Sequence, residues 1–153
     1  MKRLSVFLPL VFVACASMAP ANDAEPVLRR GAGEFAAAAN GGNVDKMVSI
    51  YADDAVLMAP NAPAFRGRDA IRQYWAGLLG MGKIEANVAT DTVVQSGDLA
   101  TEVGHYALTI SPPNAPAPVK DSGKYVITWR RTGGQWKAIY DIFNSDLPLP
   151  PPR

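Results

Sequence analysis

The segment from Tyr51 to Ile71 constrains the fold of this chain more than any other part of the sequence. It begins Tyr-Ala-Asp-Asp-Ala-Val-Leu-Met-Ala-Pro and ends Phe-Arg-Gly-Arg-Asp-Ala-Ile. This order is typical of the end of a helix, a short strand over residues 55–59, a loop over residues 60–63 and the start of another helix at Asp69. Such a succession indicates a curved-sheet domain that forms a pocket. The end of the short strand is apolar, whereas an enzyme of this shape can have an acidic residue at that point.

Three helices are predicted before residue 83, and they cover residues 25–39, 44–51 and 69–79. Apolar residues recur at helical spacing in each of them. Gly41 and Gly42 end the first helix, Asn43 caps the second, and Gly80 ends the third.

The pattern changes to a period of two after residue 83. Four long strands rich in Val, Ile, Thr, Tyr and Trp are predicted over residues 84–95, 100–110, 120–131 and 135–145. Glycine-containing turns separate the first two and the last two strands, and a proline-rich loop over residues 111–118 joins the middle pair. Helices followed by an antiparallel meander predict an α+β fold. We expect a cone-shaped antiparallel sheet, four long strands plus one short, wrapped around the three N-terminal helices.

Residues 1–21 are predicted to be a signal peptide. Lys2 and Arg3 precede an apolar run over residues 4–14 that is too short to span a bilayer, and small residues end at Ala21. The protein is then periplasmic or secreted. Alternatively, the residues around Cys15 resemble a bacterial lipobox, which would make the protein a lipoprotein anchored at Cys15. Mass spectrometry of the mature N-terminus distinguishes the two.

Composition excludes several classes of function. The formal net charge of the 153 residues is +1 and the basic residues are scattered, so no nucleic-acid partner is expected. One histidine and one cysteine, which lies in the leader, are too few for a typical metal site. No glycine loop follows a predicted strand in the way that phosphate binding requires. We therefore expect neither a metal nor a cofactor.

Several short segments carry a family resemblance. They are Asn43-Val-Asp45, Tyr51-Ala-Asp-Asp-Ala55, Gly67-Arg-Asp-Ala-Ile71, Trp129-Arg-Arg131 and Trp136-Lys-Ala-Ile-Tyr-Asp-Ile-Phe-Asn-Ser-Asp146. With these segments the chain resembles the nuclear transport factor 2-like superfamily, in particular the SnoaL-like and ketosteroid isomerase-like cone folds. The resemblance implies a cone domain over residues 22–147, followed by a proline-rich tail over residues 148–153. It is specific for the fold and weak for the reaction, because this fold carries many activities.

The catalytic residues of ketosteroid isomerase are predicted to be absent. The resemblance places Ala59 where that family has its aspartate base and Phe35 where it has a tyrosine. It places Val126 where it has a protonated acid. Steroid isomerisation by that mechanism is therefore not expected.

Asp141 is the main candidate for chemistry. Strand alternation places Ile139, Asp141 and Phe143 on one face of the last strand, and the resemblance puts a pocket aromatic at Phe143. A carboxyl group among apolar walls can act as an acid, a base or a hydrogen-bond acceptor. The alternative is a structural aspartate bonded to a loop amide or to Arg130. His105 could assist Asp141 in proton transfer if its strand face is concave; otherwise it is packed or solvated.

Three functions remain open. The first is the binding of a small apolar or aromatic molecule, with a wall formed by Phe35, Met58, Phe65, Tyr74, Trp75, Tyr106, Trp129 and Phe143. The second is a lyase or isomerase that uses Asp141, assisted by His105 or Tyr106. The third is a homodimeric assembly module, with Trp136 and Tyr140 buried on the outer sheet face. A homodimer also fits the first two functions.

Overall fold

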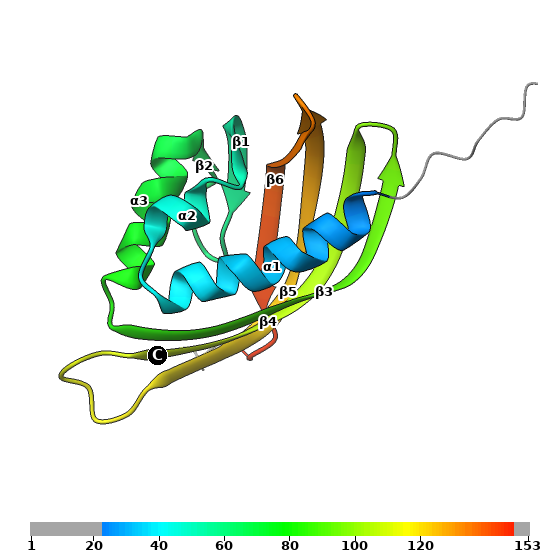
Figure 1. Cartoon of the computed structure of the whole chain (residues 1–153). Coiled ribbons are helices and arrows are strands. Elements are labelled where there is room, and N and C mark those ends of the chain that lie inside the picture. The colour runs from blue at the N-terminus through cyan, green and yellow to red at the C-terminus, as the bar shows by residue number, and fades with distance from the viewer. Residues whose placement is uncertain (1–22, 149–153) are drawn as a thin grey trace, which may run out of the picture.

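Three helices lie against the concave side of one curved sheet in the computed structural model, which describes residues 23–148 (Figure 1). The helices are α1 (Ala24–Asn40), α2 (Val44–Val48) and α3 (Arg68–Leu79). The strands are β1 (Tyr51–Met58), β2 (Phe65–Arg66), β3 (Lys83–Ser96), β4 (Leu99–Ser111), β5 (Val119–Thr132) and β6 (Gln135–Ser145). The predicted signal peptide, Cys15 and all of the proline-rich tail but Pro148 lie outside the described residues.

The α+β fold is confirmed, but the sheet is mixed rather than wholly antiparallel. Its strand order is β2-β1-β6-β5-β4-β3. β1 runs parallel to β6, while the other neighbouring strands are antiparallel. The prediction was wrong for β1 because no hairpin joins that strand to its partner: α3 and three long strands separate them in the chain. The two-residue β2 is too short to give a periodic sequence signal.

β1 begins earlier than predicted, at Tyr51, and α2 already ends at Val48. The predicted continuation of the helix to Tyr51 was therefore wrong. The backbone N–H of Ala138 donates to the carbonyl oxygen of Ile50 over 2.9 Å, and Tyr51 is paired with Ala138 in the sheet. Pairing with β6 thus outweighs the local helical pattern at these residues.

β6 contains one extra residue, Ile139, opposite the Thr128–Trp129 step of β5. This bulge shifts the alternation of side chains along the strand. Ala138 is fully buried, and Trp136 packs against the core, whereas Tyr140 is 54% exposed. The prediction that Trp136 shares the outer face of the sheet with Tyr140 was therefore wrong.

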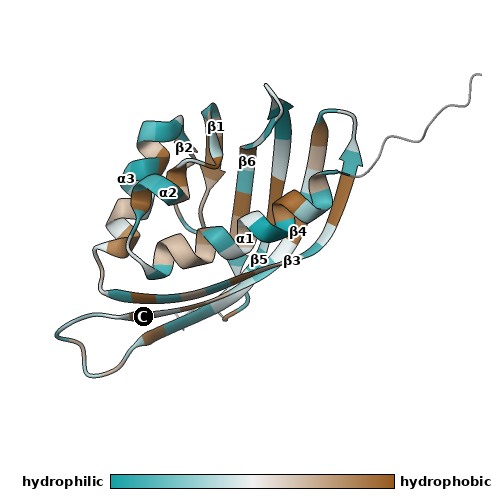
Figure 2. Cartoon of the chain, in the orientation of Figure 1, coloured by the Kyte–Doolittle hydropathy of each residue, from teal (hydrophilic) through white to brown (hydrophobic). Residues whose placement is uncertain are grey.

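The outer face of the sheet nevertheless carries an apolar surface. Val103, Val126 and Ile142 lie in one row across β4, β5 and β6 and are 40%, 39% and 47% exposed. The inner face holds the buried residues, so apolar and polar residues alternate along the long strands (Figure 2). We call Val103, Val126, Tyr140 and Ile142 the outer apolar patch.

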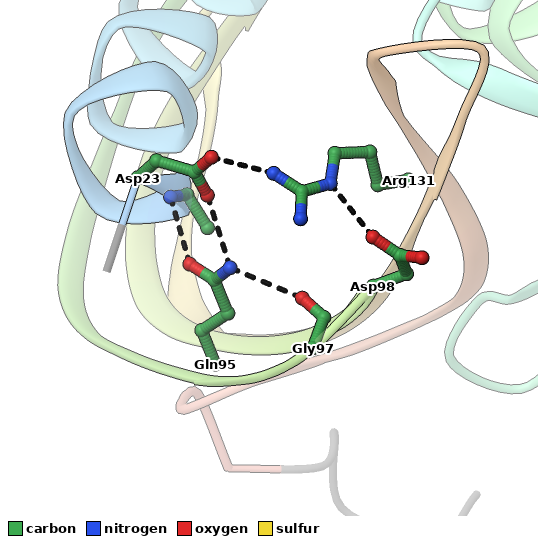
Figure 3. Close-up of polar contacts among 6 residues, drawn as sticks. Asp23, Gln95, Gly97, Asp98 and Arg131 are labelled. Carbon is green, nitrogen blue, oxygen red and sulfur yellow. Dashed lines mark hydrogen bonds and ion pairs between the residues drawn. The ribbon is translucent and has the colours of Figure 1, made fainter. Parts of the chain in front are cut away.

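Polar contacts fix the start of α1 to the sheet (Figure 3). The backbone N–H of Ala24 donates to Gln95 Oε1 over 2.9 Å, and Gln95 Nε2 donates to Asp23 Oδ1 over 2.9 Å. Arg131 bonds Asp23 Oδ2 at 2.5 Å and Asp98 Oδ1 at 2.8 Å. The end of β3, the turn after it and the end of β5 therefore hold α1 across the concave face.

Candidate functional site

A cavity of about 470 Å³ lies between the helices and the inner face of the sheet. This volume is within the range of small-molecule sites in proteins. Its wall is mostly apolar and includes six of the aromatic residues predicted to bind a ligand: Phe35, Tyr74, Trp75, Tyr106, Trp129 and Phe143.

The structure places the other two predicted ligand residues, Met58 and Phe65, outside this wall. Met58 is paired with Ile142, whose side chain is exposed on the outer face. Phe65 belongs to the edge strand β2, and its ring packs against Tyr74 with centroids 4.8 Å apart. The sequence alone could not predict where these two side chains lie, because their positions depend on how β1 pairs with β2 and β6.

The aromatic residues of the wall are in contact with one another. Trp75 stacks on Phe143, with centroids 6.0 Å apart and ring planes at 18°. Phe35 and Tyr74 meet Trp75 edge-on at 5.3 Å and 4.9 Å, and Tyr106 meets Phe143 edge-on at 5.9 Å. Such contacts between rings stabilise the wall beyond the burial of its area. The cavity thus has a rigid aromatic side.

Asp141 lies on the cavity wall, on the face of β6 that also carries Phe143. Only 5% of the residue is exposed. Tyr51 donates its hydroxyl proton to Asp141 Oδ2 over 2.6 Å, and Trp75 Nε1 donates to the Tyr51 hydroxyl over 3.3 Å. The alternative contact with Arg130 is not formed, because that guanidinium bonds Asp54 at 3.0 Å. Asp141 is therefore held by a buried tyrosine rather than by a cation.

Burial raises the pKa of Asp141 from its ordinary value of 3.8 to about 7. The hydrogen bond from Tyr51 opposes this shift, and the charge of Glu102 adds to it. Near neutral pH both the protonated and the ionised carboxyl group are therefore populated. The group can donate or accept a hydrogen bond under the same conditions.

His105 lies on the opposite face of the sheet. Its side chain is 61% exposed, and Nδ1 lies 2.8 Å from Asp91 Oδ1. Most residues of β4 that line the cavity alternate with His105 along the strand: Glu102, Tyr106, Leu108 and Ile110. The conditional pairing of His105 with Asp141 is therefore not formed.

Glu102 is a second buried acid of the cavity wall, and the sequence analysis missed it. The residue is 1% exposed and accepts three hydrogen bonds. Thr90 Oγ1 and the Tyr125 hydroxyl donate to Oε1 over 2.6 Å and 2.8 Å, and Trp129 Nε1 donates to Oε2 over 2.9 Å. The signal was present in the alternation of β4, which puts Glu102 on the same face as Tyr106.

Residues 102–106 and 121–125 repeat one pattern, acid–x–Gly–x–Tyr, on adjacent strands. The antiparallel register pairs the glycine of each segment with the tyrosine of the other. The Tyr125 hydroxyl donates to Glu102, and the Tyr106 hydroxyl donates to Asp121 over 2.9 Å. Each tyrosine thus crosses to the acid of the opposite strand.

The glycines of this double pattern leave the space that the tyrosines occupy. A Cβ atom on Gly104 would lie 2.4 Å from atoms of the Tyr125 side chain and 2.4 Å from the carbonyl oxygen of Ala89. A Cβ atom on Gly123 would lie 2.7 Å from atoms of the Tyr106 side chain. The absence of a side chain at both positions lets the tyrosines lie along the inner face of the sheet.

Two features are not found in the described part of the chain. Among residues 23–148, no three His, Cys, Asp or Glu side chains are grouped so that they could hold a metal ion. No helix in the same range is long and apolar enough to cross a membrane.

Comparison with known proteins identifies the family. The model of the SnoaL-like domain family matches residues 32–139. The chain belongs to this family. The match runs from the middle of α1 to the middle of β6, and this part forms most of the cavity wall. A comparison with functionally curated proteins finds no match.

Solved structures similar to this SnoaL-like domain share its cone fold. A ketosteroid isomerase-like protein from Erwinia carotovora atroseptica SCRI1043 is 21% identical, with a TM-score of 0.73 over 83% of this chain and 99% of that one. A nuclear transport factor 2-like superfamily protein from Salmonella enterica is 10% identical, with a TM-score of 0.72 over 83% and 94%. A nuclear transport factor 2-like protein of unknown function from Pseudomonas putida KT2440 is 26% identical, with a TM-score of 0.66 over 82% and 89%.

Within the SnoaL-like domain, the three positions compared with ketosteroid isomerase lie in different places. Phe35 lines the cavity, whereas Ala59 is buried and does not belong to its wall. Val126 is on the outer face, so the adjacent cavity-facing positions on β5 are Tyr125 and Ile127, and neither is an acid. The acids of this cavity stand at other positions of the sheet.

We predict that Asp141 makes the stability of the domain fall as the pH rises. The folded carboxyl group keeps its proton up to about pH 7, whereas the unfolded one loses it above about pH 4. The folded state therefore binds more protons in this window, and the free energy of unfolding falls by up to about 1.4 kcal/mol per pH unit because of this group. Urea unfolding between pH 4.5 and 8 should show this slope, and Asp141→Asn should reduce it. Parallel curves for the two proteins would contradict the prediction.

We also predict that Gly104→Ala destabilises the domain by about 1–3 kcal/mol, because the new methyl group displaces the Tyr125 side chain or the β3 backbone. Gly33→Ala is the matched control: it lies in α1 with nothing within 4 Å of the added atom. That change should stabilise the helix by up to about 1 kcal/mol. Urea unfolding measures both, and an unchanged stability of Gly104→Ala would show that the contact is not tight.

Proposed function

We propose that this SnoaL-like domain, exported as residues 1–21 predict, binds a small apolar or aromatic molecule in its cavity and contacts a polar group of that molecule with Asp141. The observation that carries the proposal is the buried carboxyl group of Asp141 on the wall of a mostly aromatic and aliphatic cavity. A binding or isomerase/lyase-type role is also what the family suggests.

The hydrogen bonds of Asp141 support this role. Oδ2 accepts a hydrogen bond from the Tyr51 hydroxyl. Oδ1 receives no hydrogen bond from residues 23–148 and is not among the occluded atoms without a partner. Because the carboxyl group lines the cavity, Oδ1 is the oxygen that a ligand can reach. A small number of polar groups in a mostly apolar wall fixes the orientation of a ligand.

The neutral aromatic alcohol 1-naphthalenemethanol is a suitable probe. We predict that it raises the melting temperature of the domain, and that the rise is larger the more tightly the probe binds. Ala86→Phe should weaken binding at least tenfold, because Ala86 lines the cavity on β3 and the added ring occupies part of it. Ala37→Phe adds the same ring on the exposed side of α1 and should leave binding unchanged. Equal binding by both variants would place the probe elsewhere.

The alternative function is a lyase or isomerase in which Asp141 transfers a proton. Its support is the pKa of about 7, which suits a general acid or base at neutral pH. The Asp141→Asn variant distinguishes the alternatives once a ligand is known. If the domain only binds its ligand, the variant keeps its affinity for that ligand. If the domain is an enzyme, the variant still binds but loses about 10²–10⁴-fold in turnover.

We further propose that the domain forms a homodimer through the outer apolar patch. Four exposed apolar side chains on one sheet face are unfavourable in water, and a two-fold contact would cover them on both copies. Trp136, which was expected in this contact, is not part of it.

In light scattering coupled to size exclusion, we predict a dimer for the natural sequence and a monomer for Val126→Glu, because a charge at the centre of the patch cannot be buried unpaired. Ala37→Glu adds the same charge on α1 and should remain dimeric. A monomeric natural protein, or a dimeric Val126→Glu, would contradict the proposed contact.

A further inference from the structure

We infer that the ligand of this cavity is an organic cation: a molecule with an apolar or aromatic body and a protonated amine. The inference rests on the proposed binding function and names its ligand class. It is carried by the charges of the wall, by the direction of its hydrogen bonds and by the rings beside Asp141.

The charged side chains of the cavity are mostly acidic. Among the described residues that line it, Glu102, Asp121 and Asp141 are acids, and Lys120 is the single base. Lys120 is exposed at the start of β5, whereas Glu102 and Asp141 are buried. Buried carboxylates without a counter-ion repel one another, and a bound cation would remove that cost.

The two buried acids lie in one row across the sheet. Glu102 on β4 is paired with Ile127 on β5, which is paired with Asp141 on β6. The two acidic residues are thus two strand spacings apart, about 10 Å between their backbones. Ile127 lies between them. Because the distance is short, a charged ligand group that contacts Asp141 also interacts electrostatically with Glu102.

The hydrogen-bond donors of the wall are already used by its own acids. Tyr51 donates to Asp141, and Tyr125 and Trp129 donate to Glu102. Asp121 accepts hydrogen bonds from the hydroxyl groups of Tyr106 and Ser145 over 2.9 Å and 2.5 Å. Among the lining tyrosines of the described chain, Tyr74 alone makes no such bond. Apart from Tyr74 and the exposed Lys120, the polar side chains named here therefore offer a ligand acceptors, and a protonated amine supplies donors only.

The rings next to Asp141 also favour a cation. Tyr74 and Phe143 both contact Trp75, whose Nε1 atom bonds the tyrosine that holds Asp141. The faces of aromatic rings carry negative potential and attract ammonium groups, more strongly where water is excluded. An ammonium group at Asp141 Oδ1 would therefore lie in a cavity whose wall holds both a carboxylate and aromatic rings.

The carboxyl group of Asp141 changes charge near neutral pH, because burial raises its pKa to about 7. The groups that act on it are Tyr51 on β1, Tyr74 on α3, Tyr125 on β5 and Glu102 on β4. Burial raises the pKa of each of the three tyrosines, that of Tyr74 to about 12, so they stay protonated. A cation binds the ionised form of Asp141, whereas a carbonyl compound accepts a hydrogen bond from the protonated form.

Three probes with one naphthalene body test the inference: 1-naphthylmethylamine as the cation, 1-naphthalenemethanol as the neutral compound and 1-naphthoate as the anion. Calorimetric titration of the mature protein at pH 6 and pH 8 gives their affinities. We expect the amine to bind at least tenfold more tightly than the alcohol at pH 8, and the naphthoate to bind most weakly. The affinity for the amine should rise from pH 6 to pH 8, and that for the alcohol should not.

Two variants and a control locate the effect. Asp141→Asn should remove most of the preference for the amine and its pH dependence, while keeping the affinity for the alcohol. Asp121→Asn, whose side chain is only partly buried, should reduce the preference to a smaller extent. Glu34→Gln removes the same charge from the exposed side of α1 and should behave like the natural protein.

The outcomes separate this inference from the proposed function. Binding of the alcohol as tight as that of the amine, or a preference unchanged in both Asp141→Asn and Asp121→Asn, overturns the inference and leaves small-molecule binding intact. Tight binding of the naphthoate does the same. Absence of binding by all three probes overturns the inference and removes the support for an aromatic ligand in the cavity.

Discussion

The hydrogen bond between Tyr51 and Asp141 connects the main features of this structure. It joins the first residue of β1 to the middle of β6, and these two strands form the parallel pair of the sheet. Tyr51 is fully buried, so its hydroxyl group needs a partner there. The same bond fixes the orientation of the carboxyl group that faces the cavity. The position of β1, the packing of Trp75 and the polar character of the site therefore depend on one contact.

Much of the fold could be predicted from the sequence, because its helices and long strands have clear periods. The helix ends at Gly41 and Gly80 and the four long strands need only local information. The parallel pairing of β1 with β6 needs a contact between residues about 90 positions apart, and no local pattern encodes it. The bulge at Ile139 reversed the expected face of Trp136 for a similar reason: a single inserted residue is visible only in the register with the neighbouring strand.

The candidate site could be predicted in part. Asp141 and six of the eight wall residues follow from alternation and aromatic content. Glu102 was passed over because an acid on a strand usually faces water, and its three donors come from other strands. His105 drew attention as the only histidine, yet rarity of a residue type carries no information about which face of a strand it occupies. The double acid–x–Gly–x–Tyr pattern acquires its meaning only from the register that crosses the two segments.

The place of β6 in the strand order has a consequence for how the molecule forms. Among the described strands β6 comes last in the chain, yet it lies between β1 and β5 in the sheet. β1 cannot pair with it until β6 has left the ribosome, because long-range strand pairing must wait for both segments. Folding of the N-terminal part of this domain therefore depends on a strand that is made much later than that part.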